Sequence, residues 1–246
     1  MSTYVLVHGA HHGGWCWSRV AGLLRAAGHE VFTPTLTGFG ERAHLLTADV
    51  VPAVLVRDVV AVLECEELDD VLLVGHSFGA LVALGVADRV PSRLRALLLL
   101  DGVVVEPGEP GFAGLPADVV AARIAAADGL TYPPPSPPVF GVPDPADQAW
   151  LARRLTPQPL RAYTEPFGLR APLGNGLPIR YVACTAPAYP AVHSAHSIAR
   201  REGWDFGELA GGHDAMVTAP ELTAAELLRW GSREVAPRVI PPHRQG

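Results

Sequence analysis

Short apolar runs alternate with helical stretches along much of this chain, and that alternation restricts the folds open to it. The apolar runs with the length of buried strands are 3–9, 30–36, 70–76, 94–101, 179–185 and 205–209. The helical patterns lie at 17–28, 49–65, 79–90, 191–202 and 220–230. Strands that alternate with helices predict an α/β fold, in which a mainly parallel sheet is flanked by helices.

Residues 103–175 interrupt the alternation with a long stretch in which we expect no strand. The stretch contains the proline-rich run TYPPPSPPVFGVPDP and then a helical pattern. A mobile surface insertion is one alternative, but the aromatic residues favour an ordered piece: Phe140, Trp150, Tyr163 and Phe167. We therefore expect 103–175 to be a helical cap inserted into a core made of 1–102 and 176–231. Residues 232–246 are expected to be a disordered tail.

The composition narrows the class of protein. With 246 residues, of which 49% are hydrophobic, the chain is long enough for one large domain with a sizeable core. A net charge of −6 argues against nucleic acid as a partner, since phosphate binding needs clustered Lys and Arg. No apolar run approaches the roughly 20 residues of a membrane span, and no signal-peptide pattern precedes the first strand. Cys16, Cys65 and Cys184 cannot all pair and match no zinc pattern, so we expect a reducing, cytoplasmic location.

The sequence VGHSFGA at 74–80 contains a G-x-S-x-G pattern, in which Ser77 lies between Gly75 and Gly79. The bare pattern is common by chance, but here an apolar strand precedes it and a helix of small residues follows. Flanking glycines permit a sharp strand-to-helix turn that exposes the serine hydroxyl at a helix N-terminus. The helix dipole there favours developing negative charge. We therefore predict that Ser77 is a nucleophile.

A second loop, within VLVHGAHHGGWCW at 5–17, ends the first strand in a His-Gly turn beside the expected position of the nucleophile. Such a loop can present a backbone N–H to an oxyanion, the donor that a tetrahedral intermediate needs. The predicted pair of donors is the N–H of Ala10 and the N–H of Phe78. The alternative is that His8-Gly9 forms a tight turn and nothing more.

Position, more than residue type, selects a base among the ten histidines of the chain. His213 follows the last strand, in the glycine-rich sequence LAGGHDAMVTAP, and precedes the last helix. His8 and His76 are expected to be turn residues. A serine, then an acid, then a late histidine is the chain order of one large class of hydrolases, so His213 is the predicted base.

These stretches together resemble the α/β-hydrolase superfamily, and within it the group of plant methyl esterases and hydroxynitrile lyases together with bacterial carboxylic-ester hydrolases. The matching sequences are VLVHGAHHGGWCW, VLLVGHSFGALVAL and GGHDAM, while the inserted stretch matches only loosely through RRLTPQPLRAYTEP. The resemblance implies an α/β-hydrolase fold, an acyl-serine mechanism, and no metal or organic cofactor. It also implies a triad acid after the strand before the last, in a loop that begins CT-x-D in the plant group.

The corresponding loop of this chain lacks that acid. It is YVACTAPAYP at 181–190, with Pro187 in the place of the Asp. Asp101 is the predicted substitute, because it ends the strand ALLLLD at the carboxyl edge, where parallel sheets bind ligands. A carboxylate that follows an apolar strand needs a partner, and His213 would supply one. The alternative is that Asp101 caps a helix or forms a turn before Gly102.

The other candidate acids are placed less well. The side chain of Asp214, adjacent to His213, is expected to point elsewhere. Asp205, Asp69 and Asp70 precede their strands, at the wrong edge of a parallel sheet.

A triad of Ser77, His213 and Asp101 predicts acyl transfer to water. We expect a carboxylic-ester hydrolase that acts on small to medium lipophilic esters, including aryl esters. Lyase activity is not expected, since lyases of the resembling group use a Lys near the acid loop and a Thr in the oxyanion loop. This chain has no Lys and carries Gly9-Ala10 there. Candidate walls of an apolar pocket, for which core packing is the alternative, are His11, Trp15, Phe39 and Trp150.

Two other functions stay open at this point. Thioesterases and cyclases of polyketide-type metabolism use the same triad, and an acyl carrier protein would then be the partner. Such a carrier would need an arginine patch, which the inserted stretch can supply from Arg153, Arg154, Arg161 and Arg170. A catalytically inactive, ligand-binding member of the fold is the second alternative. We expect a small-molecule partner, no metal site and no membrane association, and leave open a homodimer.

Overall fold

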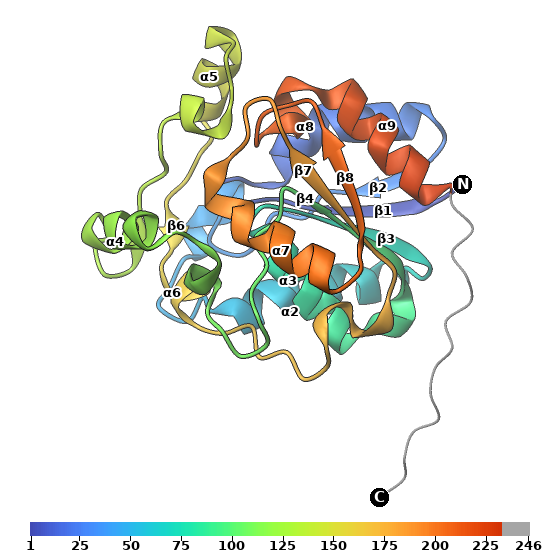
Figure 1. Cartoon of the computed structure of the whole chain (residues 1–246), viewed down its shortest axis with the longest axis horizontal. Helices are drawn as coiled ribbons and strands as arrows, with labels where there is room; N and C mark the ends of the chain where they lie inside the picture. The colour runs from blue at the N-terminus through green and yellow to red at the C-terminus, as the bar shows by residue number, and fades with distance from the viewer. Residues whose placement is uncertain (233–246) are drawn as a thin grey trace, which may run out of the picture.

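The computed structural model describes residues 1–232 of the protein. Its centre is a six-stranded sheet in the order β2-β1-β3-β4-β7-β8, whose adjacent strands all run parallel (Figure 1). The strands are β1 (Thr3–Val7), β2 (Glu30–Phe32), β3 (Val71–His76), β4 (Leu94–Leu100), β7 (Ile179–Cys184) and β8 (Asp205–Leu209). The expected α/β fold with a parallel sheet is confirmed.

Helices cover both faces of this sheet. One face carries α1 (Ser18–Ala26), α8 (Ala215–Thr218) and α9 (Pro220–Gly231). The other face carries α2 (Pro52–Cys65), α3 (Gly79–Arg89) and α7 (His193–Arg201). Short 3-10 helices lie at Gly14–Trp17, Gly40–Leu45, Pro91–Arg93, Gly111–Gly114, Pro137–Phe140, Leu173–Gly176 and Pro190–Val192.

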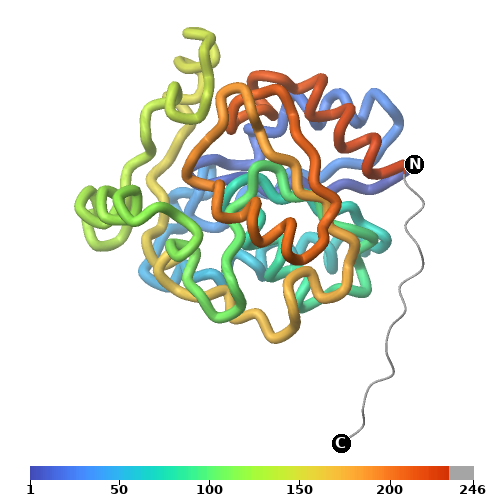
Figure 2. Tube along the Cα trace, viewed as in Figure 1, coloured from blue at the N-terminus to red at the C-terminus, as the bar shows by residue number. Residues whose placement is uncertain are grey.

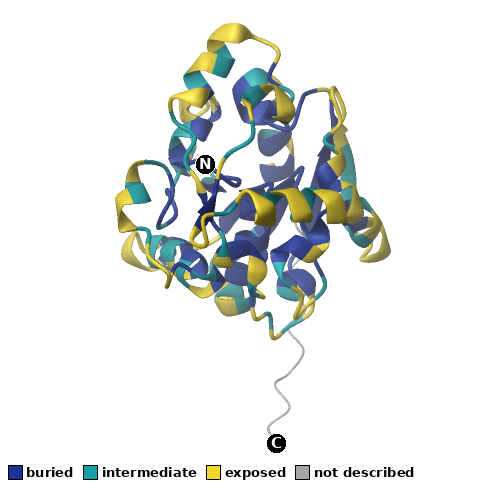
Figure 3. Ribbon diagram, turned by 90° about the vertical axis from the view of Figure 1, so that its left-hand side faces the viewer, coloured by how far each residue is buried: buried dark blue, intermediate teal, exposed yellow. Residues whose placement is uncertain are grey.

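The strands are apolar along their length because both of their faces are covered. In β1, Val5 and Val7 join the core beneath α2 and α3, while Tyr4 and Leu6 join the core beneath α1 and α9. Figure 3 shows the buried residues gathered in the interior and the exposed ones on the outer sides of the helices. Polar side chains are therefore brought together at the ends of the strands, where the loops begin.

Residues 103–175, the inserted segment, connect β4 to β7 and project beyond the carboxyl ends of the strands (Figures 1 and 2). The segment contains α4 (Ala117–Ala125), α5 (Pro145–Ala152) and α6 (Arg161–Thr164). It also contains an antiparallel strand pair, β5 (Thr131–Tyr132) with β6 (Gln158–Pro159), so the expectation of no strand there was wrong. Each of these strands has two residues, which is too short for a pattern of alternation to be visible in the sequence.

Some expected boundaries also differ. The second strand ends at Phe32 and does not reach residue 36, since Pro34 has no N–H with which to extend a ladder. Most of the expected tail, from residue 233 onward, lies outside the described residues. Within residues 1–232, none of the helices combines the length and the apolar character needed to cross a bilayer.

Candidate active site

Ser77 lies in the turn between β3 and α3, at the carboxyl edge of the sheet. Its φ of 51° is left-handed, a strained conformation that is characteristic of a serine on a sharp strand-to-helix turn. The flanking glycines make the turn possible. A Cβ on Gly75 would lie 2.5 Å from the carbonyl oxygen of Gly79, and a Cβ on Gly79 would lie 2.5 Å from that of His8. The close approach of α3 to β3 and β1 thus fixes the position of Ser77.

His213 follows β8 and contacts Ser77 directly. Its Nε2 lies 2.9 Å from Oγ of Ser77, and its Nδ1 lies 2.6 Å from Oδ2 of Asp101. Because a carboxylate only accepts hydrogen bonds, Nδ1 of the neutral imidazole carries the proton, and Nε2 accepts from the serine hydroxyl. All three side chains are buried. The structure therefore brings the predicted nucleophile, base and acid into one hydrogen-bonded chain.

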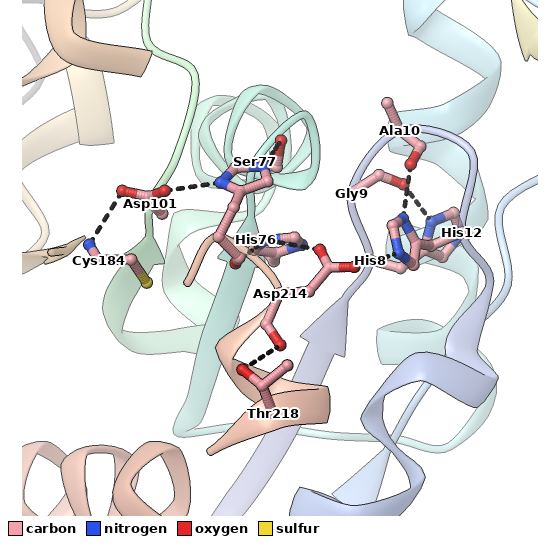
Figure 4. A network of polar contacts seen from close by, with 11 residues as sticks. His8, Gly9, Ala10, His12, His76, Ser77, Asp101, Cys184, Asp214 and Thr218 are labelled. Carbon is pink, nitrogen blue, oxygen red and sulfur yellow. Dashed lines mark hydrogen bonds and ion pairs between the residues drawn. The ribbon is translucent and has the colours of Figure 1, made fainter. Parts of the chain in front are cut away.

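Asp101 is the first residue after β4, and its backbone is also left-handed, with a φ of 45°. Its N–H donates to the carbonyl oxygen of Val182 on β7 at 2.7 Å. Its Oδ1 accepts the N–H of Cys184 at 3.0 Å (Figure 4). With Oδ2 bonded to His213, both carboxylate oxygens have partners. These bonds replace the water that the carboxylate loses, since Asp101 is 1% exposed.

The end of β7 supplies no acid, but it binds one. Cys184, the last residue of β7, donates its N–H to the carboxylate of Asp101 on the neighbouring strand. The next two N–H groups, those of Thr185 and Ala186, donate to the carbonyl oxygens of Leu209 and Gly211, at and just beyond the end of β8.

The other acids are directed away from His213. Asp214 faces His12 at 3.1 Å, with its Oδ2 on the imidazole Nε2. Asp205 bonds to Arg180 at 2.7 Å. Asp69 and Asp70 lie at the opposite edge of the sheet, where they pair with Arg93 and Arg95.

The predicted oxyanion donors carry free N–H groups. Ala10 lies in the loop after β1, and Phe78 begins the turn into α3; within residues 1–232 neither N–H donates to another group of the protein. His8 fixes the loop of Ala10, since its Nδ1–H donates to the next carbonyl oxygen at 2.8 Å and its Nε2 accepts the N–H of Leu36 at 3.1 Å. Burial lowers the pKa of His8 to about 3, so this imidazole is neutral. Two unpaired donors are therefore held in a rigid setting.

A second buried Asp–His pair lies beside this loop. Nε2 of His12 is 3.1 Å from Oδ2 of Asp214, and Nδ1 of His12 is 2.7 Å from the carbonyl oxygen of Ala10 (Figure 4). Both partners only accept, so both nitrogens donate and His12 is an imidazolium. Burial opposes that charge, but the carboxylate of Asp214 outweighs burial and raises the pKa of His12. The pair links the loop of His213 to the loop that presents the N–H of Ala10.

Aromatic rings enclose His213. Its ring centroid lies 4.1 Å from that of Tyr189, 4.7 Å from that of His76 and 6.1 Å from that of Phe140. Phe140 belongs to the inserted segment, and its carbonyl oxygen accepts the N–H of Asp214 at 3.0 Å. The inserted segment therefore reaches the residues around the predicted base and shields them from solvent.

The four residues predicted to line a pocket are dispersed. Phe39 is fully buried in the core. His11 is buried with its ring 5.1 Å from that of Tyr132, in an edge-to-face contact. Trp15 and Trp150 contact each other, with centroids 5.1 Å apart. Their role in substrate binding stays a prediction.

A cavity of about 530 Å³, the cap cavity, lies between α4, the proline-rich run of the inserted segment and the loop after β7. Its walls include Arg123, Tyr132 and Tyr189, and none of the four predicted pocket residues. Tyr189 lines the cavity and also packs on His213, so the cavity adjoins the surroundings of the predicted base. Sequence analysis missed Tyr189, although it lies in a loop at the carboxyl end of a strand, which was the available signal.

The metal-ligating side chains of the described residues are not clustered. Within residues 1–232, no group of three or more His, Cys, Asp or Glu side chains is arranged to hold a metal ion. His11 and His12 face different partners, the carbonyl oxygens of Thr156 and Ala10 respectively. The cysteines are unpaired: Cys16 and Cys184 are buried, and Cys65 is exposed.

Known proteins resemble this chain in sequence and in structure. The model of the alpha/beta hydrolase family matches residues 4–226. A carbendazim hydrolyzing esterase from Nocardioides sp. (strain SG-4G) is 41% identical over 247 residues, which cover 94% of this chain and 100% of the relative. Methylesterase 9 of Arabidopsis thaliana is 33% identical over 111 residues, or 45% of this chain and 43% of the relative. An extracellular alpha/beta-hydrolase from a Paenibacillus species, a solved structure, has a TM-score of 0.82 and 25% identity, covering 95% of this chain and 100% of that one.

Proposed function

The chain belongs to the alpha/beta-hydrolase family, and from that premise we propose that it hydrolyses carboxylic esters through an acyl-serine intermediate. The observation that carries the proposal is the chain of hydrogen bonds from Ser77 through His213 to Asp101, with distances of 2.9 and 2.6 Å. Relatives named as esterases support ester hydrolysis independently.

In the proposed reaction, Oγ of Ser77 attacks the ester carbonyl carbon while Nε2 of His213 takes the hydroxyl proton. Asp101 keeps the other proton on Nδ1 and stabilises the imidazolium that forms. The N–H groups of Ala10 and Phe78 donate to the oxyanion of the tetrahedral intermediate. His213 then gives its proton to the leaving alcohol. The same Nε2 next takes a proton from a water molecule, whose oxygen attacks the acyl carbon. The bond from that carbon to Oγ of Ser77 breaks, Nε2 returns the proton to Oγ, and the acid leaves.

The proposed substrates are small to medium lipophilic esters, including aryl esters. The mostly apolar walls of the cap cavity, next to His213, support this class. The relative that is 41% identical is named for hydrolysing carbendazim, and the plant relative is named as a methylesterase. Cyanohydrin cleavage is less well supported, because the chain has no Lys.

Covalent labelling tests the nucleophile directly. A fluorophosphonate probe should modify Ser77 in the folded protein, as read by mass spectrometry of the labelled peptide. Ser77→Ala should lose labelling and lower the kcat for phenyl acetate by about 10⁴-fold or more. Ser18→Ala, at an exposed serine that begins α1, is the matched control and should keep both.

Three results would redirect the proposal. Absence of labelling in folded protein would favour the ligand-binding alternative. Labelling at a serine other than Ser77 would refute the triad. Turnover of acyl-carrier thioesters without turnover of oxoesters would favour the thioesterase alternative.

A further inference from the structure

The cap cavity contains a cation without an acidic partner. Arg123 lines the cavity from α4, and within residues 1–232 it forms no ion pair. The one acidic residue in the same walls is Asp118, which is exposed, whereas Arg123 is partly buried. Water screens the carboxylate of Asp118 more strongly than it screens the guanidinium. The cavity therefore keeps a positive charge on its inner side.

Aromatic rings hold this guanidinium in place. Cζ of Arg123 lies 5.5 Å from the ring centroid of Tyr132 and 5.4 Å from that of Tyr163, both within the range of a cation–π contact. Nη1 of Arg123 is buried, yet it has no hydrogen-bond partner. Ring contacts thus fix the position of a guanidinium that lines the cavity and has no acidic partner there.

The neighbouring phenols add further donors. The hydroxyl of Tyr132 is buried and, like Nη1 of Arg123, has no partner in the described chain. Burial raises the pKa of Tyr132 well above its ordinary value, and burial also raises the pKa of Tyr189 although Arg123 opposes the rise. Both phenols are therefore protonated at neutral pH. A protonated phenol can donate a hydrogen bond, so these phenols and the guanidinium together suit a ligand rich in acceptor oxygens.

We propose that the cap cavity is a carboxylate-binding subsite, and that the ester substrates of this protein carry a free carboxylate remote from the scissile bond. A carboxylate accepts two hydrogen bonds from a guanidinium and neutralises its charge, which a neutral carbonyl does not. The tyrosine rings and the prolines of the wall, Pro133, Pro134 and Pro135, suit an aromatic spacer. The substrate class rests on the proposed function, since it concerns the same site.

The position of Tyr189 supports this assignment. Its side chain lines the cap cavity and packs on His213, with ring centroids 4.1 Å apart, so the cavity adjoins the residues around the predicted base. Half-esters of aromatic dicarboxylic acids, and aryl esters that carry a carboxylate on the ring, have their two ends separated by one aromatic ring. A remote carboxylate would therefore orient the ester toward Ser77.

Two substrate pairs test the subsite: 4-carboxyphenyl acetate with phenyl acetate, and monomethyl with dimethyl terephthalate. The structure predicts that kcat/KM for the acid exceeds that for the neutral partner by about tenfold or more in at least one pair. Arg123→Met keeps the length of the side chain and should abolish this preference, chiefly through a higher KM for the acid. Arg123→Lys should retain part of it. Arg170→Met, at an exposed arginine outside the cavity, is the matched control and should leave the preference intact.

A preference for the neutral partner in both pairs, or a preference that survives Arg123→Met, would overturn the subsite. Calorimetric titration of Ser77→Ala with 4-carboxyphenyl acetate, with and without Arg123→Met, separates this failure from a failure of the proposed function. If binding depends on Arg123 but the unmodified protein turns over no ester, the proposed hydrolase function is refuted and the carboxylate subsite is retained. Turnover of phenyl acetate with no Arg123-dependent binding would refute the subsite alone.

Discussion

At the scale of single residues, the neighbours of each buried histidine decide where its protons lie. His8 faces one acceptor and one donor, so it is satisfied as a neutral imidazole. His12 faces two acceptors, the carbonyl oxygen of Ala10 and the carboxylate of Asp214, so it is charged. One buried ion pair therefore lies beside the predicted triad and ties the loop of Ala10 to the loop of His213.

We predict that Asp214→Asn destabilises the fold in a manner that depends on pH. Although burial opposes both charges, the pKa of His12 is raised and that of Asp214 is lowered. The contribution of His12 is thus complete below its unfolded pKa, near 6.5, and is lost as pH rises through its folded pKa. The contribution of Asp214 is complete above its unfolded pKa, near 3.9, and is lost as pH falls through its folded pKa.

The difference in free energy of unfolding between the two proteins should therefore be largest between about pH 4 and 6.5, at about 3 kcal/mol, and should shrink at alkaline pH. Urea unfolding at pH 5.5 and at pH 9 measures it. An equal difference at the two pH values would show that His12 is not an imidazolium. A loss of ester turnover at pH 5.5 that exceeds the loss of folded protein would confirm that the pair also positions Ala10.

At the scale of elements, the acid can lie on β4 because β4 and β7 are parallel neighbours. Their carboxyl ends meet at one edge of the sheet, and the N–H of Asp101 continues the ladder between them by bonding to Val182. The left-handed turn at Asp101 then directs its carboxylate toward Cys184 and His213. A carboxylate that follows β4 can therefore reach His213. The loop after β7 then needs no acid, which explains how Pro187 is tolerated there.

A buried arginine joins β7 and β8 to α9. Arg180 of β7 bonds through Nε to Glu226 of α9 and through Nη1 to Asp205 of β8, the latter at 2.7 Å. The side chains of Arg180 and Glu226 are 7% and 9% exposed. A Cβ on Gly207 would meet the guanidinium at 2.3 Å, so the arginine lies flat on β8. This contact ties α9 to the amino ends of β7 and β8.

We predict that Arg180→Met lowers the free energy of unfolding by about 2 kcal/mol, because the buried carboxylate of Glu226 loses one of its two cationic partners and keeps Arg229. Arg201→Met is the matched control, since Arg201 and Glu106 pair at the surface with 54% and 43% of their side chains exposed. Chemical denaturation of both variants measures the effect. A change in Arg180→Met no larger than that of the control would contradict a structural role for this contact.

In the molecule as a whole, sequence patterns predicted the regular alternation of strands and helices in the core, but they did not predict the structure of the irregular inserted segment. Alternating runs predicted the sheet and its helices, which the structure and the family confirm. Ser77, Asp101 and His213 could be chosen because Ser77 and Asp101 directly follow strands and His213 lies in the loop after another, and a parallel sheet brings such positions to one edge. Their catalytic roles are proposals that the geometry supports.

The substrate pocket was beyond the reach of sequence patterns. The inserted segment has two-residue strands and a proline-rich run, and contacts across the fold decide which of its side chains face the site. Arg123 of α4 and Tyr132 of β5, for example, meet at the cap cavity, and Phe140 joins the loop of His213 through a backbone bond to Asp214. Neither contact has a local signal.

Asp101→Asn is the sharpest test of whether β4, and not the loop after β7, supplies the acid. We predict a fall in kcat for phenyl acetate of about 10⁴-fold, because the amide would hold the wrong tautomer of His213. Asp49→Asn is the matched control, because Asp49 is exposed and lies outside the predicted triad, and this variant should keep full activity. Circular dichroism and thermal melting would establish that both variants are folded. A folded Asp101→Asn protein whose kcat falls by less than about tenfold would contradict the account, since another group would then orient His213.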